Sequence, residues 1–184
     1  MACNSKTIFI SAEDQSLNAY TFADGVLEPR HKEHLKAAGT IKMMHATEEL
    51  LYGVTFKGEL IVFNANNLEE VVAKKDNPSK TGDVTAMAVS ESTGTVWVAD
   101  KKGFVHVLDA KTLEPVEVPS ELKTKEKEGT YLVASNDQGS MIALGDAKGY
   151  VSVFDASARA FKFYHYANAS KILCTQFNHD NTQI

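Results

Sequence analysis

The sequence predicts an all-β fold built from a repeated, four-stranded antiparallel unit. Short apolar segments return at a nearly constant spacing, a polar turn follows each of them, and an alternating strand follows each turn. The strands are rich in β-branched and aromatic residues, which fit a pleated, half-buried surface. No segment keeps a 3.6-residue apolar period over three turns; residues 31–38 come nearest and are interpreted as a connection between units.

Four pairs of strands define the repeat. The first strand of each pair lies at Ile8–Ile10, Tyr52–Val54, Val96–Val98 and Ile142–Leu144. The second lies at Leu17–Tyr20, Leu60–Phe63, Val105–Leu108 and Val151–Phe154, and each ends at a small polar residue, namely Thr21, Asn64, Asp109 and Asp155. The turns between the strands recur from Gln15 to Gly58, Gly103 and Gly149 at spacings of about 43, 45 and 46 residues. The three glycines are predicted to take a positive φ, which a tight hairpin needs.

Two further strands complete each unit. Inner strands are predicted at Thr40–Met44, Val84–Val89, Tyr131–Ala134 and Ile172–Phe177, and outer strands at Val26–His31, Glu69–Ala73, Pro115–Val118 and Ala160–Tyr164. Four antiparallel strands in units of this length are typical of a β-propeller blade. The sequence therefore predicts a single partial propeller over residues 1–184, with units at 1–38, 39–80, 81–128 and 129–168 and the start of another at 169–184.

The two ends of the chain bear on how the ring closes. The chain is expected to open in the second strand of a blade, so that its first blade lacks an inner strand, and to close where the next blade's second strand would begin. Unpaired edges and half a ring are unfavourable, because each blade buries its faces against its neighbours. Three outcomes stay open: a piece of a larger ring, two copies that complete one ring, or a four-bladed ring. The first is the simplest.

Composition excludes several classes of protein. The formal net charge is −5 and the lysines are scattered among carboxylates, so no basic face for nucleic acid is expected. No apolar run approaches the roughly 18 residues of a membrane span, and no secretory signal is present. Only Cys3 and Cys174 are available, the second within an apolar run where a small buried side chain is expected. This composition predicts a cytoplasmic protein.

Candidate catalytic groups are few. Asp100 and Asp146 occupy equivalent places in successive units, with Glu13 near that register, and could in principle face a metal in a central channel. The favoured interpretation is a turn aspartate that caps backbone amides. His31 and His34 lie three residues apart without a third ligand. No nucleophile setting or phosphate-binding loop is present, so the sequence predicts no enzyme, no metal and no cofactor.

Lysines are the candidate partner-binding residues. The alternating-charge segment 122–129 contains Lys123, Lys125 and Lys127, and the segment 74–82 occupies the equivalent connection one unit earlier. Their functional interpretation is a polar interaction rim, against the alternative of solvated loops. The turns between second and third strands contribute Lys101, Lys102 and Lys148, which are expected on the opposite face, where they could meet an acidic partner. Exposed lysine turns without a partner are the alternative here.

The repeats resemble degenerate WD repeats. Phe63-Asn64, Leu108-Asp109 and Phe154-Asp155 stand where that family's Trp-Asp pair ends the third strand. The chain departs from the pattern because no Gly-His pair precedes the inner strands. Its Lys57, Lys102 and Lys148 are aligned with the family's buried aspartate, and only Asp14 matches that position. The resemblance therefore implies blades that lack most of the family's hydrogen-bonded tetrad and are held by apolar packing.

Residues 82–183 resemble the second propeller of the actin-interacting WD-repeat family that cooperates with cofilin. The resemblance is carried by Val84–Val89, Ile142–Asp155 and Ser170–Ile172. It implies a protein-interaction scaffold that binds actin and cofilin, promotes filament disassembly and associates with the cytoskeleton; no binding residue of the family can be matched here. A generic WD scaffold of another complex is the alternative, and a metal-dependent propeller hydrolase is the least favoured.

Overall fold

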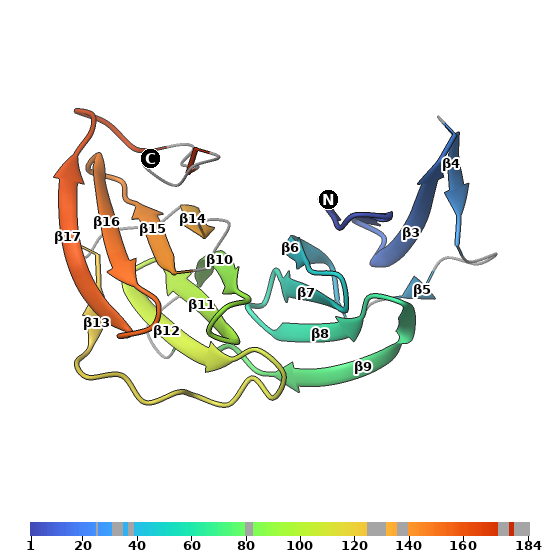
Figure 1. The fold of residues 1–184 in the computed structure, drawn as a ribbon, viewed down its shortest axis with the longest axis horizontal. Helices are drawn as coiled ribbons and strands as arrows, with labels where there is room; N and C mark the ends of the chain where they lie inside the picture. The colour runs from blue at the N-terminus through green and yellow to red at the C-terminus, as the bar shows by residue number, and fades with distance from the viewer. Residues whose placement is uncertain are drawn as a thin grey trace. The chain divides into compact units, whose positions relative to one another are not determined.

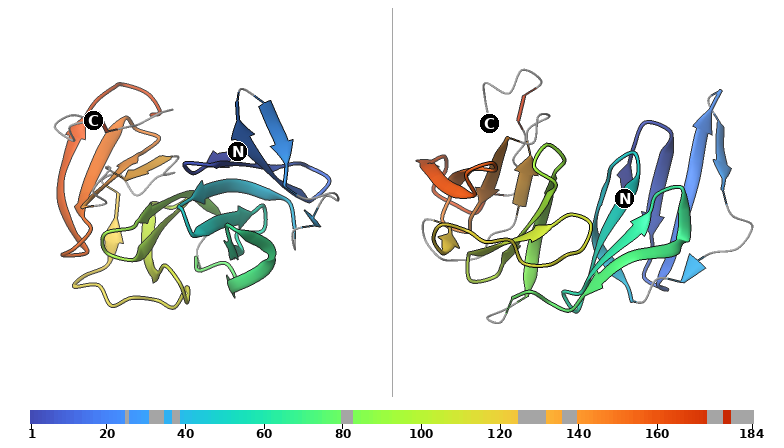
Figure 2. Two further views of the ribbon diagram at one scale, coloured as in Figure 1. Left: turned by 45° about the vertical axis from the view of Figure 1, so that its right-hand side comes forward. Right: turned by 60° about the horizontal axis from the view of Figure 1, so that its bottom comes forward.

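The computed structural model describes residues 1–24, 26–30, 35–36, 39–79, 83–124, 132–135, 140–172 and 177–178. Every element of secondary structure assigned in these ranges is a β-strand, which confirms the predicted all-β fold class. The chain divides into two compact units, Met1–Asp76 and Asn77–Ile184, and each is described by itself. Each unit holds two antiparallel sheets, labelled in Figure 1 and seen from two other sides in Figure 2.

The first unit contains two successive meanders. Its first sheet has the order β1 (Ala2–Cys3), β2 (Thr7–Ser11), β3 (Ser16–Ala23) and β4 (Val26–Pro29), and β5 (Leu35–Lys36) also pairs with β3. Its second sheet has the order β6 (Ile41–Ala46), β7 (Leu50–Thr55), β8 (Leu60–Asn64) and β9 (Asn67–Lys75). Every strand pair is antiparallel, so short turns suffice to connect neighbours.

The second unit repeats the arrangement. Its first sheet has the order β10 (Val84–Ser90), β11 (Thr95–Asp100), β12 (Phe104–Asp109) and β13 (Leu122–Lys123). Its second sheet has the order β14 (Leu132–Ser135), β15 (Met141–Gly145), β16 (Tyr150–Asp155) and β17 (Ala160–Tyr166). Four-stranded sheets in chain order are what the repeat predicts.

Apolar side chains fill the space between the two sheets of each unit. Phe9 of the first sheet and Leu51 and Phe63 of the second belong to one buried cluster of the first unit. In the second unit, Trp97 and Phe154 are both fully buried, and their ring centroids lie 6.0 Å apart. Burial of such large side chains is the main favourable contribution to folding. The buried Trp97 indole donates a hydrogen bond to Thr95 Oγ1 (3.1 Å), so its one polar group is satisfied.

The first sheet differs from the prediction at both ends. The chain was expected to open in the second strand of a blade, but β1 precedes β2 and pairs Ala2 with Phe9 and Cys3 with Ile8. Two residues are too short to show an alternating pattern, and Ala2 adds to the pairing by packing against the buried cluster. At the other end, β3 does not stop at Thr21 but continues to Ala23, where it forms a hairpin with β4.

The outer strand of the third sheet was predicted at the wrong place. Residues Pro115–Val118 form no strand; Pro115 makes an isolated bridge with Leu108, and the outer strand is β13. Proline has no N–H for a ladder, whereas Leu122 buries its side chain in the core of the unit. The last predicted inner strand, Ile172–Phe177, lies mostly outside the described residues.

No helix in the part of the chain that the structure describes has the length and apolarity needed to cross a bilayer.

Candidate interaction site

Each sheet contains a tight turn between its second and third strands, and these four turns share one backbone feature. The predicted positive φ is confirmed at the glycines, with values of 84° at Gly58, 80° at Gly103 and 87° at Gly149. In the first sheet Gln15 occupies the same position with a φ of 69°. The left-handed conformation is thus required by the turn and is not a result of glycine being present.

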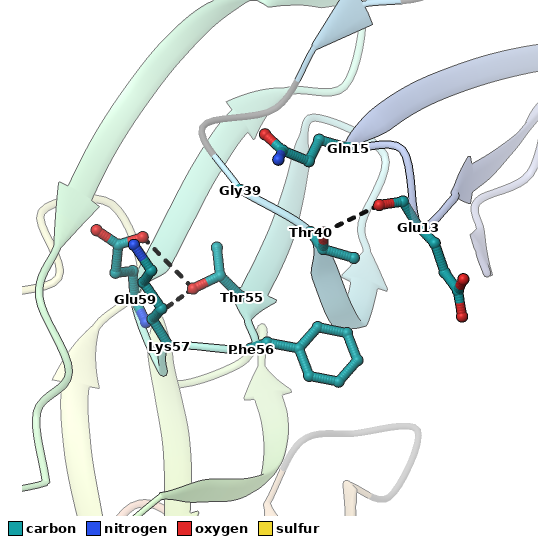
Figure 3. Close-up of a pocket in the computed structure, with 8 residues that line it drawn as sticks. All are labelled: Glu13, Gln15, Gly39, Thr40, Thr55, Phe56, Lys57 and Glu59. Atoms are coloured by element: carbon teal, nitrogen blue, oxygen red, sulfur yellow. Dashed lines mark hydrogen bonds between the residues drawn. The ribbon is translucent and has the colours of Figure 1, made fainter.

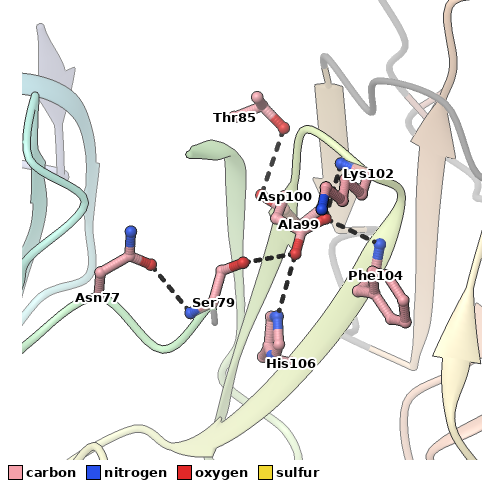
Figure 4. Close-up of polar contacts among 8 residues, drawn as sticks. All are labelled: Asn77, Ser79, Thr85, Ala99, Asp100, Lys102, Phe104 and His106. Atoms are coloured by element: carbon pink, nitrogen blue, oxygen red, sulfur yellow. Dashed lines mark hydrogen bonds and ion pairs between the residues drawn. The ribbon is translucent and has the colours of Figure 1, made fainter. Parts of the chain in front are cut away.

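A buried aspartate fixes the turn of the third sheet (Figure 4). Asp100 is fully buried, and its Oδ1 accepts hydrogen bonds from the backbone N–H groups of Lys102 (2.9 Å) and Phe104 (3.0 Å). Its Oδ2 accepts a hydrogen bond from Ser79 Oγ (2.6 Å) and lies 3.5 Å from His106 Nε2. These partners compensate the desolvation of the carboxylate, so the network holds three separate segments together.

The fourth sheet repeats the cap. Asp146 is fully buried, and its Oδ1 accepts hydrogen bonds from the N–H groups of Lys148 (2.9 Å) and Tyr150 (3.0 Å). In the second sheet Thr55 Oγ1 takes the same role and accepts from Glu59 N–H (3.2 Å). Asp100 and Asp146 therefore cap turn amides, as the favoured interpretation of the sequence has it. Within the described ranges no group of three His, Cys, Asp or Glu side chains is placed to hold a metal ion.

These contacts show which side chains of the two turns are buried and which are exposed. The buried carboxylates are Asp100 and Asp146, each two residues before Lys102 and Lys148, and not the lysine positions themselves. Apolar packing was expected to hold the blades, and in the third sheet the Asp100 network adds to it.

The structure separates the predicted lysines into three groups. Lys101, Lys102 and Lys148 are exposed on the two capped turns of the second unit. Lys123 is half-buried in β13, with its Nζ 2.7 Å from Glu121 Oε2 and 4.5 Å from the centre of the Phe104 ring. Lys125 and Lys127 lie outside the described residues. The two segments expected to form loops are partly strand, since Lys74 and Lys75 end β9 and Leu122–Lys123 form β13. The expectation that these segments lie on the face opposite the lysine turns is wrong, because Ser79 binds Asp100 and the Thr124 N–H donates to the Gly103 carbonyl (2.8 Å).

The first unit has an open cavity that the sequence did not indicate (Figure 3). It measures about 430 Å³ and lies between the turns of its two sheets. The lining residues are Glu13, Gln15, Gly39, Thr40, Thr55, Phe56, Lys57 and Glu59. Several polar groups bind one another: Thr40 Oγ1 donates to the Glu13 carbonyl (3.3 Å), and Glu59 Oε1 lies 3.3 Å from Lys74 Nζ. Thr55 Oγ1 donates to Glu59 Oε2 (3.5 Å) within the lining.

Sequence reasoning also missed the aromatic character of β17 as a surface feature. Its exposed side chains include Phe161, Phe163, Tyr164 and Tyr166. The available signal was the run Phe-Lys-Phe-Tyr-His-Tyr, which is apolar on both faces of one strand.

Together, the antiparallel four-stranded sheets and their capped turns define a β-propeller-like protein. The chain is similar to the structure of apo AztD from Citrobacter koseri, with a TM-score of 0.70 and 15% identity over 92% of this chain and 47% of that one. It is also similar to the crystal structure of the computationally designed protein Ika8, with a TM-score of 0.68 and 15% identity over 95% of this chain and 50% of that one.

At this identity the likeness concerns the fold alone. The chain spans about half the length of both structures. No protein-family profile matches the sequence, and no curated protein matches it either.

Proposed function

We propose that this chain is a protein-interaction scaffold whose contact surface includes Lys101, Lys102 and Lys148. The observation that carries the proposal is the pair of capped turns in the second unit. Each turn is fixed from within by a fully buried aspartate, while its lysines remain exposed. Fixed turns favour binding, because less conformational entropy is lost when a partner orders them.

Equivalent turns of repeated blades lie on the same face of a propeller, so these lysines form one basic surface. A basic surface on a chain of net charge −5 selects acidic partners and rejects basic ones. Actin and cofilin are the proposed partners because residues 82–183 resemble the actin-interacting WD-repeat family. The proposal places the protein in the cytoplasm with the cytoskeleton, where it would promote filament disassembly.

The test is co-sedimentation of the full chain with actin filaments, with and without cofilin. We expect the chain to pellet with filaments, and the variant Lys102→Glu/Lys148→Glu to bind at least fivefold more weakly. The matched control is Lys6→Glu/Lys111→Glu, which changes the net charge equally at exposed lysines outside the turns between second and third strands. No pelleting above background would exclude actin as the partner, and equal loss in both variants would show a general charge effect.

A further inference from the structure

The outer edge of β17, in the second unit, differs from the outer edges of the other three sheets. β17 ends its sheet, and in the described part of the chain no other strand pairs with its outer side. An exposed edge strand is a template for pairing with another chain, and proteins usually protect it with proline, carboxylates, bulges or short length.

The other outer strands carry such protection. β4 ends in Glu28 and Pro29, and proline cannot donate to a ladder. β9 carries Glu69 and Glu70 and has two register shifts against β8. β13 is only two residues long. β17 has one register shift, at Lys162, and beyond it Phe163–Tyr166 pairs regularly with β16 and contains neither proline nor carboxylate.

The side chains of β17 offer apolar contact on one face. The register pairs Tyr166 with Tyr150 of β16, with ring centroids 5.0 Å apart, and the Tyr164 ring lies 5.9 Å from the same Tyr150 ring. Tyr164 and Tyr166 are nevertheless 45% and 53% exposed, so they keep surface for a further strand. Cross-strand contacts with aromatic side chains stabilise an added strand.

The chain segment that contains β17 carries a net positive charge, whereas the whole chain is acidic. Residues 156–179 contain no aspartate or glutamate but include Arg159, Lys162 and Lys171, while the whole chain has a formal charge of −5. Lys162 is exposed on the strand itself, and His165 alternates with the two tyrosines. A partner segment that pairs here is therefore selected for carboxylates.

We infer that the edge of β17, over Phe163–Tyr166, binds an extended acidic segment of another protein by adding it as a fifth strand to the sheet. Backbone hydrogen bonds to this edge supply affinity, and alternate side chains of the segment supply specificity. Apolar side chains of the segment pack on Tyr164 and Tyr166, and its carboxylates face Lys162 and His165. The inference rests on the proposed function, that the chain binds proteins, and concerns a different surface from the lysine turns.

The experiment measures fluorescence anisotropy of a labelled eight-residue peptide of alternating glutamate and valine with the full chain. The peptide is expected to bind and to lose at least tenfold in affinity when alternate backbone amides on one edge are N-methylated, because these amides can no longer pair. Replacing its glutamates with lysine should abolish binding. Lys162→Glu should weaken binding at least fivefold, whereas Lys111→Glu, a matched change at an exposed turn of the same unit, should leave it unchanged.

Hydrogen exchange then locates the peptide. The amides of Phe163–Tyr166 should become protected at saturation, while those of residues 100–103 stay unchanged. Equal binding of peptides methylated on either edge, absence of binding, or protection confined to the lysine turns would overturn the inference. The two proposals fail separately: filament binding without peptide binding removes the β17 site alone, and peptide binding without filament binding removes actin alone.

Discussion

Ser79 Oγ donates a 2.6 Å hydrogen bond to Oδ2 of Asp100, and both side chains are buried. The bond joins the segment before β10 to the turn that follows β11, across 21 positions of the chain. Because Asp100 also accepts two backbone N–H groups, one side chain determines the conformation of the turn and the position of the entering segment. The proposed lysine surface depends on this arrangement.

Removal of the serine hydroxyl is expected to destabilise the second unit. Ser79→Ala should lower the free energy of unfolding by about 1.5–3 kcal/mol, because a hydrogen bond to a buried charged group is lost. Asp100→Ala should cost more, about 3–5 kcal/mol, since it leaves the Ser79 hydroxyl and two backbone amides without their acceptor. Urea unfolding followed by Trp97 fluorescence measures both. The control Ser157→Ala, at an exposed serine of the same unit, should change stability by less than about 0.5 kcal/mol.

A second prediction concerns Gly149, whose φ is +87°. A Cβ at this position would overlap the carbonyl oxygen of Asn168, which is backbone and cannot move away as a side chain can. Gly149→Ala should therefore prevent the second unit from folding normally. The matched control is Gly94→Ala, where φ is +62° but nothing lies within 4 Å of the added Cβ. That variant should cost only the left-handed backbone strain, about 1–2 kcal/mol. Similar losses in both variants, measured by urea unfolding, would contradict the steric argument.

The third prediction tests the turn between β2 and β3, where glutamine stands in place of the glycine found in the equivalent turns of the other three sheets. Gln15 holds a φ of 69°, a conformation that costs a residue with a Cβ about 1–2 kcal/mol. Gln15→Gly should stabilise the first unit by up to about 1 kcal/mol, because relief of the strain is partly offset by the entropy that glycine loses on folding. The reverse change, Gly58→Gln in the same unit, should destabilise it. The measurement is the Tm of the unchanged chain, of Gln15→Gly and of Gly58→Gln by thermal unfolding. A lower Tm for Gln15→Gly than for the unchanged chain would contradict the prediction and would mean that the glutamine side chain supplies compensating contacts.

Much of the fold was predictable because its strands repeat. The central strands of each sheet show period-two alternation bounded by polar turns, and the turn glycines fixed the alignment of three units. Strands that lack these signals were misplaced. β1 is too short to show any periodicity. The outer strand of the third sheet was predicted at Pro115–Val118 in place of β13, because that segment is apolar. Val116 and Val118 do pack against the core, but the segment forms no strand.

The site was less predictable because it depends on which side chains point inward. Asp100 and Asp146 were identified as turn caps from their position, but the partners Ser79 and His106 lie far from the turn in sequence or on another strand. The β17 edge was missed for a different reason. Ala160–Tyr164 was predicted as an outer strand, but a run of aromatic residues is also compatible with a buried strand, and only the structure shows that these rings stay exposed.

The last prediction concerns the pH dependence of stability. Burial lowers the pKa of His45, in β6, below its usual value of 6.5. The unfolded chain then binds more protons than the folded one between the folded pKa and 6.5, so the stability present above pH 6.5 is lost as pH falls through the folded pKa. His45→Gln should reduce the stability difference between pH 7.5 and pH 5.5, measured by urea unfolding. Hydrogen bonds also lower the pKa values of Glu48 and Asp109, but from 4.5 and 3.8, so these carboxylates act at lower pH. An unchanged difference in the variant would show that other groups, and not His45, govern stability in this range.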